Sequence, residues 1–110
     1  KGKAPQEPSW LRGHSVMVLS SIADPKAFEA TLKNLGAHIA GRLHYPDHHI
    51  YSAQDLQQIS RACWQKAFPV IVTTAKDAVK LEPLLPQIPA ELNIRILNIE
   101  FLIHDEDIIF

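Results

Sequence analysis

The sequence has few of the residues and patterns that several protein classes require. Its one cysteine, Cys63, cannot form a disulfide within the chain, a composition that suits a reducing compartment. Eleven Lys and Arg stand against twelve Asp and Glu, so no excess of positive charge points to a nucleic acid partner. No apolar run reaches the roughly 20 residues that a membrane-spanning helix needs.

Glycine is also scarce, and its placement excludes one kind of nucleotide site. The four glycines are Gly2, Gly13, Gly36 and Gly41. None of them stands before a Lys-Ser or Lys-Thr pair at the spacing of a P-loop, whose backbone N–H groups surround the phosphates of a nucleotide. We therefore expect no cofactor-binding residues, and no tight binding of ATP, within this chain.

The apolar stretches that are present predict alternating strands and helices. Strands are expected at residues 16–19, 39–45, 70–72 and 94–97, the last extending to residue 103 at most. This alternation predicts a three-layer α/β fold, in which helices flank a mostly parallel four-stranded sheet of Rossmann-like type with right-handed crossovers. We expect residues 14–110 to form one such domain and residues 1–13 to be a linker or disordered arm.

The first two helices have local start signals. Asp24 is expected to cap a helix whose first residue is Pro25, and Gly36 ends it. Ser52 and Asp55 have the spacing of a capping box, which opens a second helix.

The third helix also begins at a capping pattern, and here two interpretations remain open. Thr74 and Asp77 have the spacing of a capping box, for a helix that runs to about Leu85. A helix start with threonine hydroxyls and Lys76 beside it could equally attract an anion. Capping is the interpretation that the residues favour.

Side chains suited to chemistry gather where two of the expected strands end. Residues 45–51 follow the second strand, and residues 73–81 follow the third. Since the carboxyl ends of parallel strands share one edge of a sheet, we expect these segments to lie close together. Asp47, His48 and His49 are the strongest chemical candidates, because histidine can act as an acid, a base, a metal ligand or a carboxylate partner.

Three other interpretations of the histidines are open. A turn at Pro46 could simply leave them solvated on a loop. A metal site would recruit His44 with His48 and His49, but no cysteine pair or glutamate supports it. Metal-dependent phosphoesterases that carry an Asp-His-His motif need further aspartates on earlier strand ends, and here only Asp24 precedes the motif.

Three segments together resemble a known family. Residues 21–28 with 30–32 resemble the pattern GIANPERF…ATL, residues 45–56 resemble FPDHHPYT…DL, and residues 72–81 resemble VTTEKDAVKL. In this order and spacing they are similar to the C-terminal region of tetraacyldisaccharide 4'-kinase, the lipid A-pathway kinase of Gram-negative bacteria. The resemblance extends from about Val16 to Leu102.

The resemblance implies a function and a role for each site residue. It implies transfer of a phosphate from Mg-ATP to the 4'-hydroxyl of a tetraacyldisaccharide 1-phosphate. In the family the first histidine after the aspartate acts with an aspartate of the other domain, which implies that His48 is catalytic. Asp47, His49, Thr74 and Lys76 are then substrate-binding or supporting residues.

The resemblance also implies what this chain leaves to the rest of its protein. The family keeps its P-loop, metal ligands, base-like aspartate and membrane-associating segment in an N-terminal domain. Mg-ATP would therefore bind there, and this chain, which is expected to bind no metal, would be soluble and inactive alone. Its partners would be that domain and the lipid precursor, at the cytoplasmic side of the inner membrane.

Two departures from the family pattern leave an alternative open. Ala75 stands where the family usually has glutamate, and Ser20 and Ser21 replace a small pair of the type Cys-Gly. The chain could thus be an inactive α/β binding or regulatory module that retains the fold. An upstream P-loop domain in the same gene would decide between the two.

Overall fold

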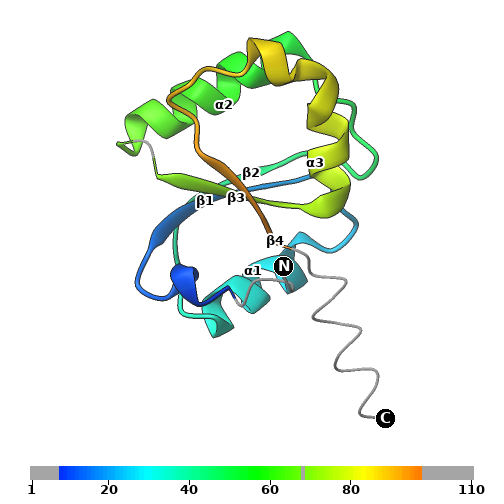
Figure 1. Ribbon diagram of the computed structural model, residues 1–110. Coiled ribbons are helices and arrows are strands. Elements are labelled where there is room, and N and C mark those ends of the chain that lie inside the picture. The colour runs from blue at the N-terminus through cyan, green and yellow to red at the C-terminus, as the bar shows by residue number, and fades with distance from the viewer. Residues whose placement is uncertain (1–7, 68, 98–110) are drawn as a thin grey trace, which may run out of the picture.

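A parallel sheet lies between two layers of helices in the computed structural model, which describes residues 8–67 and 69–97 (Figure 1). Its strands, in spatial order, are β2 (His38–His44), β1 (Ser15–Ser20), β3 (Val70–Thr74) and β4 (Ile94–Leu97). Every neighbouring pair is parallel. Helix α1 (Pro25–Asn34) covers one face, and α2 (Ala53–Gln65) and α3 (Ala75–Leu81) cover the other (Figure 1). The three-layer α/β prediction is confirmed, and the expected extension of β4 to residue 103 lies outside the described residues.

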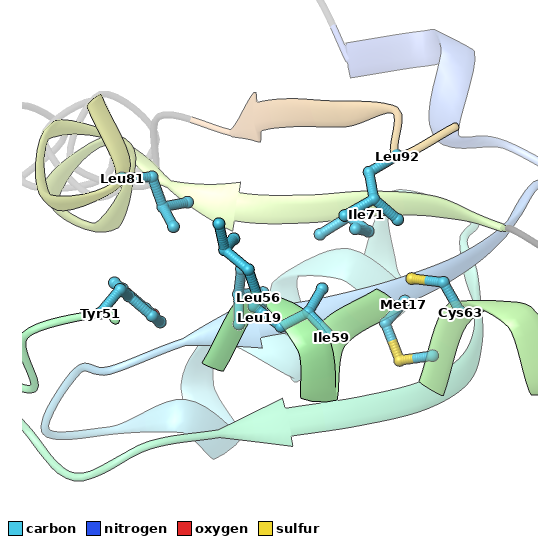
Figure 2. Packing of buried hydrophobic residues seen from close by; sticks show 9 residues of the cluster. All are labelled: Met17, Leu19, Tyr51, Leu56, Ile59, Cys63, Ile71, Leu81 and Leu92. Atoms are coloured by element: carbon cyan, nitrogen blue, oxygen red, sulfur yellow. The ribbon is translucent and has the colours of Figure 1, made fainter. Parts of the chain in front are cut away.

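The central strands contribute to two hydrophobic cores because successive side chains of a strand point to opposite faces. Val16 and Val18 of β1 face α1, whereas Met17 and Leu19 face the other layer. The core on the α1 side also contains Leu11, Phe28, Leu32, Ala37, Val72 and Leu97. The second core, shown in Figure 2, also contains Tyr51, Leu56, Ile59, Cys63, Ile71, Leu81 and Leu92. Cys63 is therefore a buried thiol, and burial raises its pKa.

The helix starts follow the local signals. Asp24 caps α1, and its Oδ1 accepts a hydrogen bond from Ala27 N at 3.1 Å, with Pro25 as the first helical residue. At α2 both halves of the capping box form between Ser52 and Asp55. These predictions are confirmed. In the described part of the chain, no helix is both long and apolar enough to cross a membrane.

Of the two predicted helix ends, the structure has the first but not the second. After α1 the chain turns at Gly36, whose φ of 95° lies in the left-handed region that glycine adopts most readily. The prediction that the third helix reaches Leu85 is wrong. Helix α3 ends at Leu81 and continues as the 3-10 helix η2 (Glu82–Gln87). Pro83 and Pro86 lack the N–H that an α-helix would use there, which accounts for the change.

Part of the expected N-terminal arm packs against the domain. Residues Pro8–Leu11 form the 3-10 helix η1, and Leu11 is fully buried. The guanidinium of Arg95, on β4, lies 5.0 Å from the centre of the Trp10 ring, within the range of a cation–π contact. Trp10 and Leu11 of the expected arm thus pack against the folded domain.

Candidate functional site

The order of the strands creates a switch point at the carboxyl ends of β1 and β3. The chain passes from β1 outward to β2 on one side, and then returns to form β3 on the other side of β1. The two crossing helices, α1 and α2, lie on opposite faces of the sheet (Figure 1). In open α/β sheets, ligands bind in the crevice at such a point.

A cavity of about 430 Å³ lies at this edge. Three segments that are far apart in the sequence form its walls: the turn after β1, the loop between β2 and α2, and helix α3. Its lining residues are Ser21, Ile22, Ala23, Asp47, His48, Lys76, Val79 and Lys80. The structure therefore brings Asp47, His48 and Lys76 together, as the sequence led us to expect.

His48 presents its ring to solvent at this cavity. Its side chain is 89% exposed, and its Nε2 lies 3.5 Å from Oδ2 of Asp47. The backbone φ of His48 is 68°, in the left-handed region that few residues other than glycine adopt. An exposed imidazole at the switch point is free to meet a group that arrives from outside the domain.

His49 has different surroundings and does not line the cavity. Its Nε2 donates a hydrogen bond to Oδ2 of Asp55 at 2.7 Å, and its ring stacks on Tyr45 with the ring centres 4.5 Å apart. Burial alone would raise the pKa of Asp55, but the hydrogen bonds from His49 and Ser52 outweigh it and hold that pKa below its ordinary value. His49 thus secures the start of α2.

Asp77 is the buried polar centre of the site. Its carboxylate has no exposed surface and accepts hydrogen bonds from four groups. The donors are the N–H of Ser21 at 3.1 Å, the hydroxyl of Ser21, the hydroxyl of Thr74 at 2.7 Å and the hydroxyl of Tyr51 at 3.0 Å. One carboxylate therefore joins β1, β3, α3 and the loop that carries His48.

Thr74 takes part in this buried network and is not part of the cavity lining. Its Oγ1 accepts the N–H of Asp77 at 3.1 Å, which caps α3 as predicted. The expected second half of the box, from the backbone N–H of Thr74 to the carboxylate of Asp77, does not form. That carboxylate accepts from the hydroxyl of Thr74 and from Ser21 and Tyr51. The hydroxyl of Thr74 is buried, so its role in this geometry is to hold the start of the helix.

Two lysines of α3 supply positive charge at the cavity. Lys76 is exposed, whereas Lys80 is partly buried and its Nζ donates to Oγ of Ser21 at 3.0 Å. Because Ser21 is itself bound to Asp77, the ammonium group of Lys80 is held in one place. Beside the carboxylate of Asp47, the lining thus has two ammonium groups and one imidazole, which can bind an anionic group such as a phosphate.

The histidines named in the metal interpretation do not share a site. His44 turns to α1, where its Nε2 donates to Glu29 and its Nδ1 lies 2.8 Å from Oγ of Ser20. His48 and His49 have the separate partners given above. Among residues 8–67 and 69–97, no three His, Cys, Asp or Glu side chains are grouped to hold a metal ion.

Sequence reasoning missed four residues of this site: Ser21, Tyr51, Asp77 and Lys80. From the sequence, Asp77 is predicted only as part of a capping box, and Ser21 appears only as a departure from the family pattern. A signal was present at one of them, because Lys80 follows Asp77 by three residues and shares its helix face. The partners of Asp77 at residues 21 and 51 depend on tertiary contacts that no local pattern indicates.

Comparison with known proteins places the chain in a family. The family model described as tetraacyldisaccharide-1-P 4'-kinase matches residues 1–109. A tetraacyldisaccharide 4'-kinase of Syntrophus aciditrophicus is 41% identical over 75 residues, which are 68% of this chain and 20% of the relative. One from Anaeromyxobacter sp. (strain Fw109-5) is 42% identical over 86 residues, which are 78% of this chain and 23% of the relative.

The match covers most of this chain but only a small part of each relative. A third tetraacyldisaccharide 4'-kinase, from Bdellovibrio bacteriovorus, is 39% identical over 74 residues, which are 67% of this chain and 22% of that protein. The chain thus matches about a fifth of the length of these curated relatives. No solved structure matches it. Because the family model matches nearly the whole sequence, the chain belongs to the tetraacyldisaccharide 4'-kinase family.

Proposed function

We propose that this chain is the C-terminal α/β domain of a kinase that uses Mg-ATP to phosphorylate the 4'-hydroxyl of a tetraacyldisaccharide 1-phosphate, a lipid A precursor. Family membership supports the reaction type. The chain matches about a fifth of its relatives, so the proposal places the P-loop, the Mg-ATP site and the membrane contact in an N-terminal domain. The full protein would act at the cytoplasmic side of the inner membrane.

The observation that carries the proposal is the cavity at the switch point, with an exposed imidazole on one wall and two lysines on another. His48 is on the loop after β2, and Lys76 and Lys80 are on α3. A cavity open at the sheet edge can form one half of a cleft whose other half belongs to a second domain. The phosphorylated substrate would lie between the two.

In the proposed reaction, a carboxylate of the other domain takes the proton of the 4'-hydroxyl. The hydroxyl oxygen then bonds to the γ-phosphorus while the bond from that phosphorus to the β–γ bridging oxygen breaks, and ADP leaves. His48 would hydrogen-bond to that carboxylate and hold it toward the hydroxyl. Lys76 would contact an anionic phosphate of the substrate.

The departures from the family pattern do not favour an inactive module in this geometry. Ala75 lines a neighbouring apolar groove and not the cavity that contains His48. The hydroxyl of Ser21 belongs to the Asp77 network and accepts from Lys80. The residues at positions 21 and 75 therefore do not displace the side chains on which the proposal rests, those of His48, Lys76 and Lys80.

We expect this chain alone to show no saturable binding of Mg-ATP in the micromolar range, because none of its glycines builds a P-loop. Isothermal titration calorimetry on the chain measures this directly, and the full-length protein is the positive control. A clear micromolar isotherm with the chain alone would contradict the assignment of ATP to the other domain.

Replacing Lys76 with alanine in the full-length enzyme should raise KM for the lipid substrate and leave KM for ATP unchanged. Lys76 is exposed and lines the cavity, so the change removes positive charge there at little cost in stability. Steady-state kinetics with each substrate varied in turn measure both constants. Lys33→Ala is the matched control, because Lys33 is exposed in the last turn of α1 and does not line the cavity.

Thermal melts separate this binding role from a structural one. Thr74→Ala removes the cap of α3 and should cost roughly 0.5–2 kcal/mol of stability. Lys76→Ala should leave the melting temperature close to that of the unchanged protein. If KM for the lipid is the same in the Lys76→Ala enzyme as in the unchanged one, this part of the proposal is wrong.

A further inference from the structure

The loop that carries His48 needs support from outside itself. Within residues 45–52, between β2 and α2, one backbone hydrogen bond closes a turn, from His49 N to Pro46 O at 3.0 Å. The left-handed backbone of His48 is less favourable for a residue with a Cβ than the ordinary regions are. Contacts with the rest of the domain must therefore hold this conformation.

Tyr51 provides such a contact three residues after His48. Its ring is buried in the core on the α2 side, with 5% of its surface exposed, and lies at the same end of that core as Leu81 of α3 (Figure 2). Its ring edge also meets His49 and Tyr45, with ring centres 5.2 and 5.4 Å apart. Its hydroxyl donates a hydrogen bond to Oδ1 of Asp77 at 3.0 Å.

Asp77 is a firm anchor because other groups hold it independently of Tyr51. Ser21 donates both its N–H and its hydroxyl to the carboxylate, and Thr74 donates its hydroxyl. Ser21 directly follows β1 and Thr74 ends β3, and these are the two central strands. Burial and the charge of Asp77 raise the pKa of the Tyr51 phenol, so its hydroxyl keeps the proton that it donates.

We propose that Tyr51, anchored by Asp77, is a positioning residue that sets the place of His48 in the cavity. The inference rests on the proposed catalytic role of His48 and adds a residue that acts only through it. The hydrogen bond from Tyr51 to Asp77 fixes the loop to the switch point, and the His48 ring is thereby presented at the edge where the reacting groups meet.

Tyr51→Phe in the full-length enzyme tests the proposal, because it removes the hydroxyl and keeps the ring in the core. We expect kcat to fall by about 10- to 100-fold, the loss that a small misplacement of a reacting group produces, with both KM values unchanged. Tyr45→Phe is the matched control. It removes a tyrosine hydroxyl from the same loop, where the partner is Gln58 and not Asp77, and should leave kcat unchanged.

A double-mutant cycle with His48→Ala separates positioning from a general effect on the fold. If Tyr51 acts through His48, Tyr51→Phe should lower kcat in the unchanged enzyme and have no further effect in the His48→Ala enzyme. An equal fold-loss in both backgrounds would show that Tyr51 supports the fold alone and would overturn the proposal. An undiminished kcat in the Tyr51→Phe enzyme would overturn it as well.

A measurement that does not depend on activity distinguishes failure of this inference from failure of the proposed function. In heteronuclear NMR spectra, the amide signals of Asp47 and His48 should shift in the Tyr51→Phe protein and stay in place in the Tyr45→Phe protein. If His48→Ala leaves kcat intact while these shifts occur, the catalytic role of His48 is wrong and the anchoring is supported. If the shifts are absent, the anchoring itself is wrong.

Discussion

His48→Ala should lower kcat of the full-length enzyme by about 10²- to 10⁴-fold, the range that assistance by a general acid or base contributes. KM for ATP should change little, because the proposal places the nucleotide in the other domain. The expectation rests on the exposed ring of His48 at the cavity, where it can meet the carboxylate of that domain. Steady-state kinetics with both substrates measure the two effects.

His49→Ala is the matched control for that experiment, since the two histidines are adjacent in the sequence. The ring of His49 is bound to Asp55 and stacked on Tyr45, so its loss should lower stability more than it lowers kcat. Equal kinetic losses in the two variants, or full activity of the His48→Ala enzyme, would remove His48 from the mechanism.

Among the variants proposed, Asp77→Ala should lower the free energy of unfolding most, by about 3–5 kcal/mol. The change leaves four buried donors without their acceptor: the N–H and hydroxyl of Ser21 and the hydroxyls of Thr74 and Tyr51. Each unsatisfied buried group costs about 1–3 kcal/mol, and some of the four can find new partners. Small domains have only about 5–15 kcal/mol of stability in total. Urea denaturation followed by circular dichroism gives the free energy of unfolding.

Asp55→Ala is the control for Asp77→Ala, because the two aspartates have the same spacing from their capping residues, Ser52 and Thr74. Asp55 is less buried and has two partners, Ser52 and His49. Its replacement should therefore cost about 0.5–2 kcal/mol. Equal losses for the two variants would show that Asp77 contributes as a helix cap and not as the centre of a buried network.

Where local chemistry governs the backbone, the sequence was a sufficient guide. An aspartate before a proline starts α1, and the Ser52–Asp55 pair starts α2, because the partners of each cap lie within three residues. The run of four apolar residues from Val16 to Leu19 is typical of a strand buried on both faces, and all four are buried in the structure. The predicted end of the third helix at Leu85 is wrong although its cause is also local: Pro83 and Pro86 lack the N–H that an α-helix would use, and α3 ends at Leu81.

The site was predictable in part, for a topological reason. The sequence placed Asp47, His48 and Lys76 after strands, and parallel strands bring such segments to one edge. The residue pattern alone could not show which of the two adjacent histidines, His48 or His49, faces the cavity. That choice depends on the left-handed backbone of His48 and on the packing of His49 against Tyr45 and Asp55.

The sequence by itself determined the α/β class, the helix starts and the family, since these depend on residues close to one another or on short motifs in a fixed order. Only the tertiary structure decided what Asp77 does. The pairs Ser52–Asp55 and Thr74–Asp77 have the same spacing, yet one carboxylate closes its own helix and the other accepts from Ser21 and Tyr51. The difference arises because α3 begins at the switch point, where the strand order places the ends of β1 and of the His48 loop against it. A carboxylate buried there binds the donors that surround it, and those donors are 56 and 26 residues away in the sequence.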